Sequence, residues 1–189
     1  MTSLPSPPAG GLPDRIHIFG ASGSGTTTLA AEIASRYGHC HLDTDDFFWL
    51  RTDPPYREPR PREERVALLR AALHEAKRWV LSGSLCGWGD PLIAEFDLVV
   101  FLFVPAPVRL ARLRAREIER YGPHAIAPGE VLHGAHVEFL EWAGRYDTGG
   151  PEMRSRAMHE AWLAALPGPV VRLEGDRPVA EQLGQICEG

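Results

Sequence analysis

The sequence has no basic surplus and no long apolar run, and each absence excludes a class of partner. Acidic residues outnumber basic residues by 25 to 20, which gives a net charge of −5 at pH 7. A protein that binds duplex nucleic acid through its phosphates normally carries a basic surplus, so we expect no nucleic-acid partner. A membrane span needs roughly 20 apolar residues. The longest apolar run, 98–104, has only the length of a buried strand, so we expect no membrane partner.

Cysteine and lysine are also scarce. The three cysteines, Cys40, Cys86 and Cys187, are too few and too scattered for a disulfide framework. A reducing cytoplasm is therefore the simplest compartment. Lys77 is the only lysine among the 20 basic residues. A cation that binds phosphate in this chain is therefore expected to be an arginine.

The length and composition indicate one globular domain. The chain has 189 residues, of which 44% are hydrophobic and 24% charged, and this length can bury a sizeable core. Residues 1–14 are rich in Pro, Gly and Ser and have neither the basic start nor the apolar centre of a signal peptide. We therefore predict a disordered N-terminal tail over 1–14 and a single folded domain over 15–189.

Short apolar segments alternate with amphipathic ones along this domain. The apolar segments predict strands near 15–19, 39–42, 79–81, 98–104 and 170–173. Helices are predicted between them, because apolar residues recur there at helical spacing. This alternation predicts an α/β fold with a parallel sheet and right-handed crossovers. Ligands of such sheets bind beyond the carboxyl ends of the strands, so the loops that follow the strands should form one site.

A glycine loop follows the first predicted strand. It matches the pattern G-x-x-x-x-G-K-[ST] except that Thr26 stands in place of the lysine. Backbone N–H groups of such a loop, and the start of the helix after it, bind phosphates. The loop therefore predicts a nucleoside triphosphate site, with the Thr27 hydroxyl offered to Mg²⁺; a glycine-rich turn without a ligand is the alternative. The predicted binding residues are Gly20, Ala21, Ser22, Gly23, Ser24, Gly25, Thr26, Thr27 and Thr28.

Three aspartates follow the second predicted strand. Asp43 could hold Mg²⁺, and Asp45 could orient an acceptor hydroxyl and accept its proton. Asp46 is expected to cap the next turn. The alternative is that all three aspartates begin a helix, which is a common use of Asp.

Four arginines on one predicted helix are spaced by three, four and four residues: Arg109, Arg112, Arg116 and Arg120. This spacing places them on one face, where guanidinium groups could clamp phosphates and replace the lost lysine charge. Arg112 and Arg116 are the best candidates for this catalytic role, with Arg112 also binding the nucleotide. The alternative is a solvated face that pairs with neighbouring glutamates.

Two further groups could contribute to a site. The turn after the last strand, Asp176, Arg177 and Pro178, could contact an adenine base through its backbone. Aromatic residues after the second and third strands could line an acceptor pocket or belong to the core: Phe47, Phe48, Trp49 and Trp88.

Together these residues resemble the small P-loop nucleoside and nucleotide kinase superfamily, which includes adenylate, shikimate, gluconate and uridine kinases. The resemblance spans roughly 15–187 and rests on the segments 20–28, 42–46, 101–116 and 175–178. It implies a three-layer α/β/α P-loop NTPase fold with five parallel strands in the order 2-3-1-4-5. It also implies an arginine-rich lid, about 112–129, that closes over ATP.

The chain also departs from these families. Thr26 replaces the loop lysine, and the segment 82–90 lacks the Asp-Gly-x-Pro-Arg run of adenylate kinases. The Asp-x-Asp after the second strand is instead similar to the shikimate-kinase type, where such residues serve magnesium and the acceptor.

The expected function is ATP- and Mg²⁺-dependent phosphoryl transfer to a small-molecule hydroxyl, by a monomer or a homodimer. The acceptor could be a nucleoside, a nucleotide or another hydroxyl compound. The alternative is a non-catalytic nucleotide-binding protein or sensor with a degenerate P-loop. A nucleotide hydrolase is disfavoured, because the apolar run 98–104 ends at Pro105 and not in an acidic pair.

Overall fold

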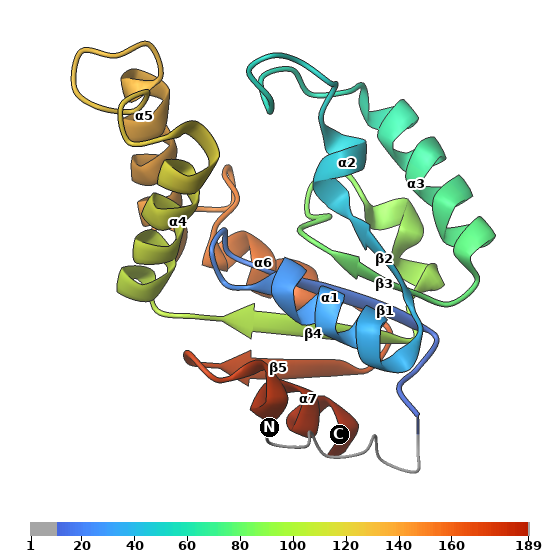
Figure 1. The fold of residues 1–189 in the computed structure, drawn as a ribbon. Coiled ribbons are helices and arrows are strands. Elements are labelled where there is room, and N and C mark those ends of the chain that lie inside the picture. Colours follow the sequence, from blue (N-terminus) through green and yellow to red (C-terminus); the bar gives the residue numbers. More distant parts are fainter. Residues whose placement is uncertain (1–10, 189) are drawn as a thin grey trace.

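The centre of the protein is a five-stranded sheet, seen in a computed structural model that describes residues 11–188 (Figure 1). All neighbouring strands are parallel, and their order is β2-β3-β1-β4-β5, which confirms the predicted topology. The strands are β1 (Arg15–Gly20), β2 (Cys40–Asp43), β3 (Trp79–Ser82), β4 (Leu98–Phe103) and β5 (Val170–Glu174).

Helices cover both faces of the sheet, which confirms the three-layer architecture. One face packs against α1 (Thr26–Tyr37) and α7 (Val179–Glu188). The other packs against α3 (Arg62–Ala76), α6 (Arg156–Ala164) and the short 3₁₀ helix η1 (Asp90–Glu95). The remaining helices are α2 (Thr44–Phe48), α4 (Ala106–Tyr121), α5 (His133–Gly144) and the 3₁₀ turn η2 (Arg145–Asp147). No helix in this part of the chain is long and apolar enough to cross a membrane.

Alternate residues of the strands supply two separate cores. Ile16 and Ile18 of β1 face α1 and α7, whereas Phe19 faces α3 and α6. This follows from the two-residue period of a strand, which points successive side chains to opposite faces. The central strands are apolar on both sides because helices cover both faces. Each large apolar side chain buried in this way contributes about 1.5–3 kcal/mol.

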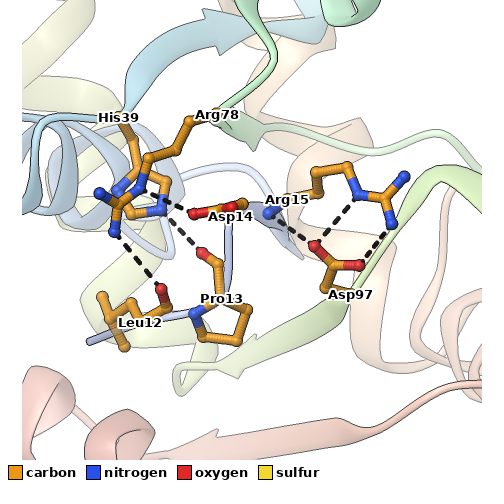
Figure 2. A network of polar contacts seen from close by, with 7 residues as sticks. All are labelled: Leu12, Pro13, Asp14, Arg15, His39, Arg78 and Asp97. Atoms are coloured by element: carbon orange, nitrogen blue, oxygen red, sulfur yellow. Dashed lines mark hydrogen bonds and ion pairs between the residues drawn. The ribbon is translucent and has the colours of Figure 1, made fainter. Parts of the chain in front are cut away.

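A network of polar contacts joins the amino ends of the strands, on the side of the sheet away from the glycine loop (Figure 2). The guanidinium of Arg15 contacts both carboxylate oxygens of Asp97, at 2.6 and 3.1 Å. Asp97 also accepts the backbone N–H of Arg15 at 3.1 Å. Beside this pair, Arg78 contacts the Asp14 carboxylate at 3.1 Å. These contacts fix the entry of the chain into β1.

The packed part of the chain begins before β1, which differs from the predicted tail over 1–14. Residues 1–10 lie outside the described residues. Leu12, however, is 5% exposed and belongs to the core beneath α1 and α7. The carbonyl oxygen of Pro13 accepts a hydrogen bond from His39 Nε2 at 2.8 Å. Composition alone did not reveal this, because a single leucine within a Pro- and Gly-rich segment carries no periodic signal.

His17 is fully buried in the middle of β1. Its Nε2–H donates to the Gly83 carbonyl at 2.9 Å, and its ring stacks on Phe19 at 5.3 Å between centroids. Burial lowers the pKa of His17 to about 4, and the hydrogen bond to Gly83 opposes this only in part. The unfolded chain has the ordinary His pKa near 6.5, so it takes up this proton first as the pH falls. The contribution of His17 to the free energy of unfolding is therefore fully present above about pH 6.5 and is lost as the pH falls towards 4.

We predict that His17→Phe makes the free energy of unfolding less dependent on pH. The substitution removes a group that costs about 2 kcal/mol of stability between pH 7 and pH 5. Urea denaturation at the two pH values measures this, with the exposed His74→Phe as the control. An equal fall in stability for wild type and His17→Phe would contradict the assignment.

Candidate functional site

A cavity of about 630 Å³ lies beyond the carboxyl ends of β1, β2 and β3. Its walls come from the glycine loop, the start of α2, the loop after β3, the end of α4 and the inner side of α5. In Figure 1 the α4–α5 pair stands on one side of this region and α2, with the loop after it, on the other. The sheet topology therefore brings together the loops after β1, β2 and β3.

The glycine loop is packed tightly against α4. Ser24 N–H donates to the Ala21 carbonyl at 3.1 Å and closes the turn. Gly23 has a φ of +81°, and a Cβ at this position would lie 2.7 Å from the Arg109 carbonyl oxygen. A glycine is therefore required here. Six residues of the loop line the cavity, whereas Ser24 is buried beneath it: Gly20, Ala21, Ser22, Gly23, Thr26 and Thr27.

The Asp43 carboxylate lies at the centre of the polar contacts next to the loop. One of its oxygens accepts hydrogen bonds from the hydroxyls of Thr27 and Ser82, at 3.0 and 2.7 Å. The other accepts the backbone N–H of Asp45 at 3.0 Å, which caps α2. Asp43 thus caps a helix, as the alternative interpretation of the three aspartates after β2 expected. It also lies beside Thr27, the other predicted metal ligand.

The Thr27 and Asp43 oxygens fit a magnesium ion that arrives with a nucleotide. Mg²⁺ prefers hard oxygen ligands, and proteins commonly give it one or two carboxylates while phosphates and water complete its shell. Across residues 11–188 there is no cluster of three or more His, Cys, Asp or Glu side chains that could hold a metal without such help. A hydroxyl and a carboxylate in contact at a phosphate-binding loop match this requirement.

Asp45 opens into the cavity from the first turn of α2. Although solvent reaches it through the cavity, protein surrounds it on the other sides. This burial raises the pKa of Asp45, and the charge of Asp43 raises it further. The guanidinium groups of Arg154 and Arg116 act in the opposite direction. A carboxylate with a raised pKa is a stronger base than an ordinary aspartate, which suits the role predicted for it.

Arg109 does not face the cavity, contrary to the predicted four-arginine face. It is fully buried, and its guanidinium donates to Asp147 at 2.9 Å and to the Val104 carbonyl at 2.8 Å. Its side chain also lies over the Tyr146 ring, at 4.9 Å. The four arginines do share a helix face, as their spacing requires. That face is covered by α5 and η2 at the start of α4 and open at the end of the helix.

The other three arginines of α4 lie in two places. Arg112 contacts the Gly23 carbonyl at 3.5 Å and pairs with Asp176 at 2.5 Å, so it joins the glycine loop to the turn after β5. Arg116 and Arg120, one and two turns further on, line the cavity. The predicted clamp is therefore divided between the edge of the loop and the cavity.

The turn at Asp176 to Pro178 is near the glycine loop through its contact with Arg112, but it does not line the cavity. Its own contacts hold it in place, because Arg177 Nε donates to the Glu174 carbonyl at 2.9 Å. The Arg177 carbonyl in turn accepts from Gln182 at 3.0 Å. The base-binding role of this turn stays a prediction.

The predicted lid, 112–129, does not form one separate element. Its first half is the end of α4, which continues to Tyr121, and the second half belongs to the loop before α5. Its role as a lid stays a prediction. The aromatic cluster is also divided, because Phe47 packs against the core alone, whereas Phe48 and Trp88 pack in the core and also line the cavity. Trp49 lines the cavity.

Several residues that line the cavity were not predicted from the sequence. Arg154 lies between η2 and α6, with its guanidinium 5.8 Å from the ring of Trp142. Tyr56 and Phe139 also line the cavity. None of these residues belongs to a motif. Tyr56 and Arg154 come from segments without a helix or strand pattern that would indicate their direction, and Phe139 lies on α5. Arg154 could have been suspected only as one of many arginines.

A buried chain of hydrogen bonds supports the cavity wall. His159 contacts the Ser84 hydroxyl through Nε2 at 3.1 Å and the Tyr146 hydroxyl through Nδ1 at 2.9 Å. Burial, with the nearby Arg154 charge, lowers the pKa of His159 to about 3. The imidazole is therefore neutral and too weak a base to activate Ser84 as a nucleophile. We interpret it as a bridge that fixes the loop after β3.

Comparison with known proteins assigns the chain to a family. Residues 16–129, more than half of the chain, match the family model described as AAA domain. The chain belongs to this family. It is also 47% identical to the uncharacterized protein YqaC of Bacillus subtilis, over 92% of this chain and 95% of that protein.

Other relatives are kinases. The cytidylate kinase of Pyrococcus horikoshii is 33% identical, over 54% of this chain and 57% of that protein. A gluconokinase structure from Sinorhizobium meliloti covers 94% of this chain and 91% of its own, with a TM-score of 0.51 and 17% identity, and shows the likeness of fold alone. The predicted membership of the P-loop small-molecule kinase superfamily is confirmed.

We predict that Arg109→Met lowers the free energy of unfolding by about 3 kcal/mol, because Asp147 and two backbone carbonyls lose a buried partner. Arg114→Met is the matched control, since this arginine lies on the exposed side of the same helix. Urea denaturation at pH 7 measures both variants. Equal stability of the two variants would show that the buried ion pair contributes little.

Proposed function

We propose that the protein transfers the γ-phosphoryl group of ATP, with Mg²⁺, to a hydroxyl of a small molecule bound in the cavity. The observation that carries this proposal is the contact of Thr27 with Asp43 at the glycine loop, with Asp45 held next to them. Thr27 lies 3.0 Å from one Asp43 oxygen, and the backbone N–H of Asp45 lies 3.0 Å from the other. The kinase-type fold and family support the same reaction.

Each group has a defined role in the proposed transfer. Backbone N–H groups of residues 20–28 bind the phosphates, and bound Mg²⁺ would neutralise part of their charge beside Thr27 and Asp43. Asp45 orients the acceptor hydroxyl and takes its proton as the oxygen bonds to the γ-phosphorus. The bond between that phosphorus and the bridging oxygen of ADP breaks. Positioning and charge supply most of the catalysis in reactions of this type.

Arginines replace the charge that Thr26 cannot supply. Arg112 lies at the loop itself, because its Nη1 is 3.5 Å from the Gly23 carbonyl. Arg116 lines the cavity, and its charge reaches Asp45. Arg154, from the segment before α6, lines the cavity as well, and its charge also acts on Asp45. We assign the stabilisation of the γ-phosphoryl charge to Arg112 and Arg116, since one guanidinium can donate hydrogen bonds to two phosphate oxygens at once.

The first experiment is calorimetry of ATP binding, with and without Mg²⁺. Micromolar binding that is strengthened by Mg²⁺ would support the proposed site, and ADP release can then be screened with nucleosides, nucleotides and sugar acids. Absence of binding at millimolar ATP would overturn the proposal. The cytoplasmic location and a monomeric or homodimeric state stay predictions.

We predict that Asp45→Asn lowers the rate of phosphoryl transfer by about 10²–10⁴-fold, because the acceptor hydroxyl loses its base. ATP affinity should stay within about threefold of wild type, since the phosphates are bound by the loop backbone. Asp46→Asn is the control, because this neighbouring aspartate does not line the cavity. Undiminished transfer in Asp45→Asn would exclude the role given to it.

One observation favours a second function, a nucleotide-binding sensor. Thr26 lines the cavity where a transferring enzyme of this fold usually has a lysine. Thr26→Lys separates the two functions, with ATP affinity and ADP release as the measurements. In a kinase the added charge changes the rate of transfer, because it lies beside the phosphates. In a sensor the added lysine changes the affinity for ATP alone. Neither the wild type nor Thr26→Lys then releases ADP with any acceptor.

A further inference from the structure

The segment between α2 and α3 folds into an arch over the cavity. Its two ends are tied together, because Leu50 N–H donates to the Glu58 carbonyl at 2.9 Å and Arg60 N–H to the Phe48 carbonyl at 2.8 Å. Trp49 and Pro59 form an antiparallel bridge between these bonds. We define the arch as residues 49–59. These bonds close its base, so the Leu50 and Arg60 amides exchange with solvent only when the arch opens.

Tyr56 lies at the tip of the arch and meets α4. The guanidinium of Arg120, on the last turn of α4, lies 4.9 Å from the centre of the Tyr56 ring. Both side chains line the cavity. Tyr56 has a φ of +63°, a conformation that is uncommon for residues other than glycine and that often marks a functional position. Trp49 packs edge-on against the same ring, at 6.2 Å between centroids.

The contact has the strength that a reversible closure needs. Besides Tyr56, Arg120 contacts the Glu117 carboxylate at 3.9 Å and lies 5.9 Å from the centre of the Tyr121 ring. At an exposed aromatic ring such a cation contact changes the equilibrium between the closed and open arch by only about threefold. This change is enough to favour a joined arch, yet small enough for thermal motion to open it at every turnover.

We propose that Tyr56 and Arg120 form a clasp that closes the cavity between the arch and α4. In this role they are positioning residues. The closed clasp keeps the arch over the bound acceptor, and the open clasp lets the acceptor in. Its consequence for catalysis rests on the proposed function. A closed cavity keeps water from the γ-phosphorus, where it would otherwise replace the acceptor and yield ADP and inorganic phosphate.

The clasp itself is tested without any turnover, by hydrogen exchange of the Leu50 and Arg60 amides in the nucleotide-free protein. We expect Tyr56→Ala and Arg120→Met to accelerate this exchange about threefold or more, which corresponds to the energy of the lost contact. Tyr56→Phe keeps the aromatic ring and should exchange as slowly as wild type. Glu58→Ala, an exposed change in the same arch, is the control. Wild-type exchange in Tyr56→Ala would overturn the clasp.

Its role in excluding water is tested by the ratio of ATP hydrolysis to phosphoryl transfer. We expect Tyr56→Ala to raise this ratio about tenfold, because water gains access to the γ-phosphorus. Glu58→Ala should leave the ratio unchanged. An unchanged ratio in Tyr56→Ala, with faster exchange of the arch, would overturn the exclusion of water. If wild type transfers phosphate to no acceptor while Tyr56→Ala still exchanges faster, the proposed function fails and the clasp stands.

Discussion

The close packing of the glycine loop against β4 and α4 determines where the other parts of the site lie. At Gly23 a side chain would meet the Arg109 carbonyl at 2.7 Å, so the loop can follow this path only with a glycine. This approach brings the start of α1, the end of β1 and the first half of α4 together. The parallel sheet then delivers Asp43 and the loop after β3 to the same edge. The contact of Gly23 with α4 and the parallel order of the strands thus place the loops that form the base of the cavity.

The far wall of the cavity depends on polar groups that are buried without a role in the chemistry. Arg109 binds Asp147, and the neighbouring Tyr146 reaches Ser84 through the neutral His159. Burying polar and charged groups costs free energy unless each has its hydrogen-bond partner. The segment between α5 and α6 therefore has few other conformations that keep all of these partners. Arg154 lies within this segment. Its place in the cavity is therefore a consequence of the buried network.

The sequence could predict the parts of the site that belong to regular patterns. The strands, the glycine loop and the pair Asp43 and Asp45 follow from local periodicity and from strand-end positions, and the strand order followed from the resemblance. Arg109 could not be placed, because spacing gives a helix face but not what covers it. Tyr56 and Arg154 come from irregular segments whose direction is set by contacts distant in sequence. The same limit explains why the packing of Leu12 was not foreseen.

The loss of the loop lysine has a consequence for how this site would work. A lysine in the glycine loop is fixed to the start of α1, so its charge is present whether the cavity is open or closed. In this chain Arg112 stands at the edge of the loop, whereas Arg116 and Arg154 line the walls of the cavity. If Arg116 and Arg154 supply part of the charge, the stabilisation of the γ-phosphoryl group depends on how closely these walls approach each other. Closure by Tyr56 and Arg120 would then both exclude water and complete the electrostatics, so that ATP is activated only when the acceptor is enclosed.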